Sequence, residues 1–71
     1  MNKKELKGLS KKIAFQEFRR SKATTLEEKQ DAERNIIKLS NKIKSMRDIV
    51  LLDDMILEEL DKLLKDENSW H

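Results

Sequence analysis

The sequence contains no cysteine, no proline and a single glycine, Gly8. Without cysteine, disulfides and thiolate metal sites are excluded, and a reducing compartment suits the chain. Without proline and with one glycine, almost nothing interrupts a helix. No apolar run approaches the roughly 20 residues of a membrane span, and none follows the N-terminal lysines as in a signal peptide. These absences predict an all-α chain with no membrane segment.

The chain is short and polar, with 71 residues, 37% of them hydrophobic and 42% charged. A domain of this size buries only roughly 60% of its unfolded surface, so its core is small. The composition is too polar for a thick interior and too apolar for a disordered tail. We therefore predict two to three helices in an extended, non-globular, coiled-coil-like arrangement that is ordered by partners.

The net charge of +2 conceals a gradient along the chain. Residues 1–22 hold eight Lys or Arg against two Glu, a balance of +6, whereas residues 48–71 hold eight Asp or Glu against two Lys, a balance of −6. A polarised chain of this kind can turn its basic end to a polyanion, or its two ends can simply neutralise each other. We divide it into a basic N-terminal arm or helix, 1–22, and a helical scaffold-docking region, 23–71.

Apolar residues recur at helical spacing from residue 3 to about 20, which predicts a first helix. Thr24 and Thr25 are each followed three residues later by glutamate, as in a capping box. In that motif the hydroxyl and the carboxylate bind free amides of a new helix. A second helix is therefore expected to begin near Leu26 and to reach about residue 46.

From Ala32 to Leu64 the apolar positions step by four and three, and Asp53 alone breaks the series. Such spacing is typical of a coiled-coil seam. Asp48 is a suitable cap for a third helix over 49–66, and one continuous helix is the alternative. The run IVLLDDMIL at 49–57 places apolar side chains on nearly every face, so more than one surface must cover it.

Catalytic chemistry is not predicted. The single histidine, His71, ends the chain, and the adjacent acids Glu58 and Glu59, or Asp53 and Asp54, point in different directions on a helix. We predict a non-enzyme with no catalytic residue, metal, cofactor or small-molecule substrate.

Without catalytic chemistry, binding through exposed side chains is the remaining kind of function. Cations near the N-terminus are candidates for binding RNA phosphates, although solubilising lysines are the simpler interpretation. The candidates are Lys3, Lys4, Lys7, Lys11, Lys12, Arg19 and Arg20, with Lys22 beside them. Apolar candidates for a protein interface are Phe15, Phe18, Ile36, Leu39, Ile43, Val50, Leu57, Leu60, Leu64 and Trp70. Phe15 and Phe18 are candidates for anchoring a core or an interface, or for stacking on bases. Trp70 either inserts into a pocket of a partner or lies in solvent at the end of the chain.

Three ordered blocks resemble the ISY-type pre-mRNA-splicing factors, subunits of the Nineteen complex. They are Lys3 and Lys7 followed by FQEF at 15–18, SKATTLEEKQDAERNIIKLSNKI at 21–43 with Arg34, Ile36, Ile37, Ser40 and Lys42, and Lys62, Leu63, Leu64, Lys65 and Asp66 followed by Trp70. Lys4 and Glu5 depart from the family pattern, the connection after Arg20 is short, and the loop near Asp48 is trimmed. The family's longer C-terminal region is missing, so the resemblance implies a minimal or truncated version.

The resemblance implies a nuclear, non-catalytic spliceosomal subunit that supports mRNA splicing at the branching stage. Its N-terminal arm would approach U6 small nuclear RNA and the intron branch region, with Lys3, Lys4, Lys7, Lys11 and Lys12 against phosphates. Its later helices would dock on helical-repeat scaffold proteins. Two other functions fit the residues, namely a self-associating helical hairpin that serves as a phage or bacterial adaptor or chaperone, and a small RNA-binding helical-bundle dimer.

Overall fold

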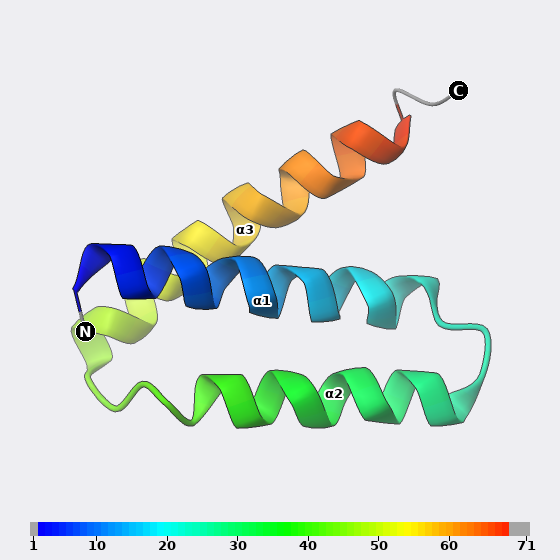
Figure 1. Ribbon diagram of the computed structural model, residues 1–71, viewed down its shortest axis with the longest axis horizontal. Coiled ribbons are helices and arrows are strands. Elements are labelled where there is room, and N and C mark those ends of the chain that lie inside the picture. Colours follow the sequence, from blue (N-terminus) through cyan, green and yellow to red (C-terminus); the bar gives the residue numbers. More distant parts are fainter. Residues whose placement is uncertain (1, 69–71) are drawn as a thin grey trace.

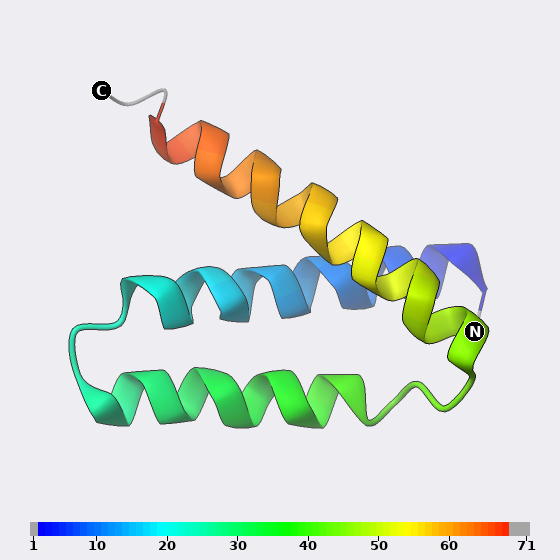
Figure 2. The ribbon, with the colours of Figure 1, turned by 180° about the vertical axis from the view of Figure 1, so that it is seen from behind.

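Three α-helices form the structure, a computed structural model that describes residues 2–68. α1 spans Lys3–Lys22, α2 spans Leu26–Ser40 and α3 spans Met46–Asn68, with no strand among the described residues. α1 and α2 lie antiparallel as a hairpin, and α3 crosses α1 obliquely on the face seen in Figure 2 (Figures 1 and 2). The predicted all-α class is confirmed.

The two N-terminal caps follow from the residues that precede α1 and α2. The Asn2 side chain accepts a hydrogen bond from the Glu5 amide at 2.8 Å. The Thr25 hydroxyl accepts from the Glu28 amide at 3.2 Å, and the Glu28 carboxylate accepts from the Thr24 amide at 3.4 Å. Of the two predicted capping registers, the one that begins at Thr25 is used, and the predicted start of α2 at Leu26 is confirmed.

The end of α2 differs from the prediction, because the helix stops at Ser40 rather than near residue 46. The Lys42 amide donates to the Leu39 carbonyl at 3.3 Å, and the Ile43 amide donates to the Ser40 carbonyl at 3.1 Å. These bonds span three residues instead of four, so they tighten the last turn and end the α-helix. Ile43 is buried in the core just beyond that turn.

α3 begins at Met46, where the Ile49 amide donates to the Ser45 carbonyl at 3.0 Å. The predicted start at Ile49 with Asp48 as its cap is therefore wrong, and so is the alternative of one continuous helix. Asp48 lies within the first turn, where its carboxylate is favourably placed beside the free amides of the helix N-terminus.

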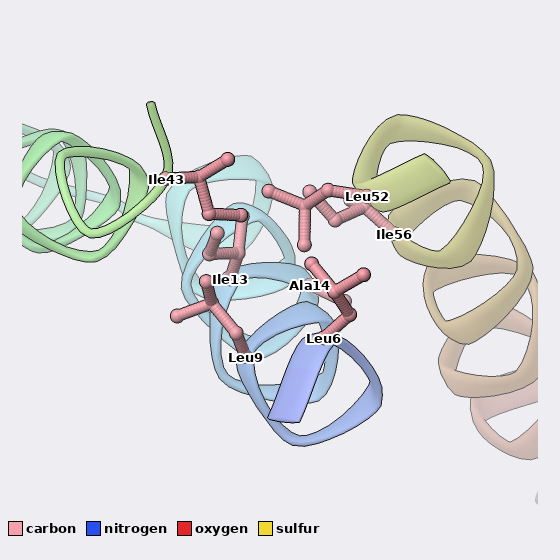
Figure 3. Packing of buried hydrophobic residues seen from close by; sticks show 7 residues of the cluster. All are labelled: Leu6, Leu9, Ile13, Ala14, Ile43, Leu52 and Ile56. Atoms are coloured by element: carbon pink, nitrogen blue, oxygen red, sulfur yellow. The ribbon is translucent and has the colours of Figure 1, made fainter. Parts of the chain in front are cut away.

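α1 is the central helix, because it contacts both α2 and α3, which are not in contact with each other. Its buried residues Leu6, Leu9, Ile13 and Ala14 form one stripe at helical spacing. Figure 3 shows this stripe meeting Ile43 from the loop after α2 and, on the other side, Leu52 and Ile56 from α3. The partly buried residues packed around this core are Ile36, Leu39, Met55, Leu60 and Leu63.

Small side chains allow the helices to approach closely at the core. Ala14 and Ala32 are completely buried, as is Ser10. The Ser10 hydroxyl donates to the Lys7 carbonyl at 2.7 Å, so its burial leaves no polar atom unsatisfied.

The helices pack compactly, so the predicted extended arrangement is not what the structure shows. The radius of gyration over Cα atoms is 12.7 Å, near the value of about 11 Å for a compact chain of this length and far below about 26 Å for an unfolded one. The loop over 41–45 returns the chain so that α3 packs across α1. The shape is flat, with extents of 36 × 28 × 14 Å.

Replacing Ile13 by alanine tests this core. Ile13 is 1% exposed, so Ile13→Ala is expected to lower the free energy of unfolding by about 2–5 kcal/mol, because it leaves a cavity. Urea unfolding followed by far-UV circular dichroism measures the change. The matched control is Ile37→Ala, because Ile37 is 59% exposed on α2, and a change within about 0.5 kcal/mol is expected there. Equal losses in the two variants would contradict the packing.

Candidate interaction surfaces

The outward side of α1 carries a continuous basic face. Positions 4, 8, 11, 15, 19 and 22 follow one line along the helix, since they step by three and four residues. No acidic residue stands on this line. We call the basic face of α1 the exposed residues Lys4, Lys7, Lys11, Lys12, Phe15, Arg19 and Lys22. From Lys4 to Lys22 it is about 27 Å long, at 1.5 Å per residue.

Five of the seven predicted RNA-binding residues lie on this face, and two do not. Lys3 lines two shallow hollows between α1 and α3, where Asp48, Glu58 and Glu59 are also found. Arg20 is half-buried, whereas the residues of the basic face are exposed. The structure therefore turns Lys3 towards acidic residues of α3 and separates Arg20 from the outward lysines.

Arg19 is already engaged within the chain. Its guanidinium donates to the Gln16 side chain at 3.0 Å and lies 3.7 Å from the Asp31 carboxylate on α2. Lys7 has no salt bridge within residues 2–68, but it lines the same hollow as Glu58 and Glu59. Lys4, Lys11 and Lys12 have no salt bridge there and line no hollow with an acidic residue. These three lysines are therefore the cations of the face whose charge is least compensated.

The two phenylalanines have different surroundings, although both were predicted as anchors. Phe15 is 52% exposed in the middle of the basic face. Phe18 is half-buried, and the Lys22 ammonium lies 5.9 Å from its ring centroid, a cation–π contact. Phe15 is therefore available to a ligand, whereas Phe18 is partly used within the chain.

α3 has two apolar stripes. Leu52 and Ile56 face the core. On another side Met46, Val50, Leu57 and Leu64 are 75%, 58%, 65% and 40% exposed. Their spacing of four and seven places them in one row along the helix. We call these four residues the outer seam of α3.

The predicted interface residues divide between the core and the surface. Val50, Leu57 and Leu64 belong to the outer seam. Ile43 is buried in the core, while Ile36, Leu39 and Leu60 pack partly against it, so contacts within the chain account for these four. Trp70 lies outside the described residues.

Two exposed apolar residues of α2 were missed from the sequence. Leu26 is 70% exposed and Ile37 is 59% exposed. Their separation of three helical turns puts them on one face, a signal that the heptad count concealed because it followed Ile36 and Leu39 instead.

Two other kinds of site are absent from the described part of the chain. No group of three or more His, Cys, Asp or Glu side chains gathers there as a metal site. None of the three helices combines the length and apolarity of a membrane span.

Comparison with known proteins gives no match to any family model, curated protein or solved structure. The resemblance to ISY-type splicing factors stays a prediction.

Gly8 stands on the line of the basic face, and a Cβ atom built there meets nothing within 4 Å. Gly8→Ala is therefore expected to raise the free energy of unfolding by about 0.5–1 kcal/mol, because alanine favours a helix interior. Thermal unfolding measures the change. Lys12→Ala, at another exposed position of α1, is the control and should change stability by less than about 0.5 kcal/mol. A lower free energy of unfolding for Gly8→Ala would contradict the open space around the Cβ position of residue 8.

Proposed function

We propose that the protein is a non-catalytic ribonucleoprotein subunit that binds RNA along the basic face of α1 and docks on a protein partner through α3. The observation that carries this proposal is the row of exposed cations on α1, with Phe15 among them and no acidic side chain in line. A folded chain gains little from aligning like charges, since they repel each other at helical spacing. A polyanion removes that repulsion and releases counterions on binding.

The residue types favour unpaired RNA over a duplex. Lysine ammonium groups act as point charges that position phosphates without reading sequence. The exposed Phe15 ring adds a flat apolar surface, and stacking on an aromatic ring requires a base that is free of its own stack. The proposed ligand is therefore single-stranded or looped RNA with weak sequence preference.

The negative charge of α3 suits docking on a protein rather than binding RNA. Between Met46 and Asn68 there are eight Asp or Glu against three Lys or Arg, a balance of −5. Such a helix is repelled by phosphates, so RNA approaches from the side of α1. The outer seam then remains available for a protein.

The resemblance to ISY-type factors supplies the specific assembly for this proposal, which is the spliceosome. In that setting the basic face lies near U6 small nuclear RNA and the intron branch region, α3 docks on helical-repeat scaffold proteins of the Nineteen complex, and the protein acts in the nucleus at the branching stage. A non-catalytic subunit is expected there because RNA and metal ions carry out splicing.

Charge reversal on α1 tests the RNA-binding half. The variant with Lys4, Lys7 and Lys11 all changed to Glu is expected to bind a single-stranded RNA oligonucleotide more than about tenfold more weakly, because three phosphate contacts are lost. The slope of log affinity against log salt concentration should fall by about 2, at about 0.7 per phosphate contact. Fluorescence anisotropy across a salt series measures both quantities.

The matched control changes Lys29, Lys38 and Lys44 to Glu, three exposed lysines outside α1. The net charge changes equally, so only the position differs. An equal loss of affinity in both variants would show that binding depends on total charge and would reject the basic face as the site. Phe15→Ala extends the test, because it should weaken binding to single strands while leaving a duplex of equal length unaffected.

The spliceosomal setting has its own test. If the chain is tagged in its own cell and purified at low salt, U6 small nuclear RNA and crooked-neck-like repeat proteins are expected to copurify. The Lys4, Lys7 and Lys11 charge-reversal variant should retain the repeat proteins, because α3 is unchanged. Recovery of neither component with the wild-type chain would remove the spliceosome from the proposal while leaving RNA binding to be decided by the affinity measurements.

A further inference from the structure

The outer seam of α3 is interrupted once, by a charge. Met46, Val50, Leu57 and Leu64 follow heptad spacing, and residue 53 is the position in that series where another apolar side chain is expected. Asp53 occupies it. The carboxylate is exposed and has no salt bridge within the part of the chain that the structure describes.

Asp53 determines what can cover this seam. A helix that packs on the seam removes water from the carboxylate, and a buried charge without a partner is strongly unfavourable. The covering helix must therefore present apolar side chains along the seam and a cation at one place, opposite Asp53.

A second copy of α3 does not meet this requirement. Two copies packed in parallel and in register place Asp53 against Asp53. Packed antiparallel with Met46 against Leu64, they place Asp53 against Leu57, which offers no charge. Each α3 also has a balance of −5, so two of them repel each other. The basic face of a second copy supplies cations but only one strongly exposed aromatic ring, too little to cover four apolar residues.

We propose that the outer seam of α3 binds one amphipathic helix of another protein, with apolar residues at heptad spacing and an arginine or lysine opposite Asp53. This inference rests on the protein-docking half of the proposed function and specifies the partner's chemistry. Met46 and Leu64 are about 27 Å apart along the helix, so the partner helix needs about five turns. An apolar face laid along an exposed apolar row is a common mode of helix recognition.

The surroundings of Asp53 strengthen the requirement for a basic partner. Asp54 follows it, is exposed and has no salt bridge within residues 2–68. Further along, Asp61 is paired with Lys65 at 2.9 Å and Glu59 with Lys62 at 3.7 Å, so the cations of the C-terminal half of α3 are already used. The chain itself leaves the negative charge at 53 and 54 uncompensated, and a partner can specify its register there.

Synthetic peptides provide the probe. A fluorescein-labelled amphipathic peptide has six positions at heptad spacing, matching residues 46, 50, 53, 57, 60 and 64 of α3. It carries leucine or isoleucine at five of them and one arginine. Two versions place the arginine at the third or the fourth position, so that either orientation is tested. The control peptide has the same composition, with that arginine exchanged for a glutamine of its outer face. One arginine version is expected to bind the full chain at least about tenfold more tightly than its control, a ratio that corresponds to 1.4 kcal/mol.

Variants of the protein test whether Asp53 causes the preference for the arginine peptide. Asp53→Asn should remove the preference for the seam arginine, whereas the matched Asp54→Asn variant, one residue away and off the seam, should retain it. Leu57→Glu should weaken both peptides at least about tenfold, and its far-UV circular dichroism should equal that of the wild type because Leu57 is 65% exposed.

The inference is overturned if the arginine and control peptides bind equally, if neither binds the folded chain, or if Asp53→Asn leaves the preference intact. It is also overturned if sedimentation shows a discrete dimer that Leu57→Glu disperses, because a second copy would then occupy the seam. RNA affinity of the Leu57→Glu protein separates this result from the proposed function. Unchanged RNA binding with failed peptide binding removes only the partner helix, and the reverse result removes only the RNA.

Discussion

The contact of one narrow apolar stripe on α1 with both of its neighbours holds this structure together. Leu9 and Ile13 lie towards α2 and the loop that follows it, while Leu6 and Ala14 lie towards Leu52 and Ile56. Because α2 and α3 are not in contact with each other, residues 2–68 form no second core between these two helices. The orientation of α1 is thus fixed by burial on one side, and the same burial fixes which of its lysines face outwards.

Part of the fold could be predicted because its signals are local. The spacing of the apolar residues identifies α1, and the Thr25–Glu28 pair identifies the start of α2. A break before the third helix was predicted near Ser45–Asp48, but its position at 41–45 was not, since this loop contains neither glycine nor proline and Ile43 falls in phase with the heptad count. Only its packing against α1 reveals that Ile43 belongs to the core rather than to a continuing helix. The compact arrangement was missed because the prediction of an extended one rested on the short length and polar composition, which do not show how helices pack.

The residues of the candidate surfaces could be predicted from their type, but the side of the helix that faces the core could not. An apolar helix such as α3 offers several possible inner faces, and its packing against α1 selects the one with Leu52 and Ile56. Val50, Leu57 and Leu64 then remain outside. On α1 the lysines were identified together, but only the position of α3 shows that Lys3 and Lys7 lie beside its acidic residues Glu58 and Glu59. Tertiary packing decides these directions, and a single sequence contains little information about it.

The central place of α1 also has a thermodynamic consequence. Either of the two proposed ligands would require α1 to be helical, because the lysines align only on a helix and α3 is held in place only through α1. A ligand that favours the ordered state therefore increases the population that the other ligand needs, even though the two never touch. Linkage would make this effect reciprocal, so each proposed ligand would strengthen the affinity for the other by the same factor. In the proposed function, the single shared helix would thus couple RNA binding to partner binding.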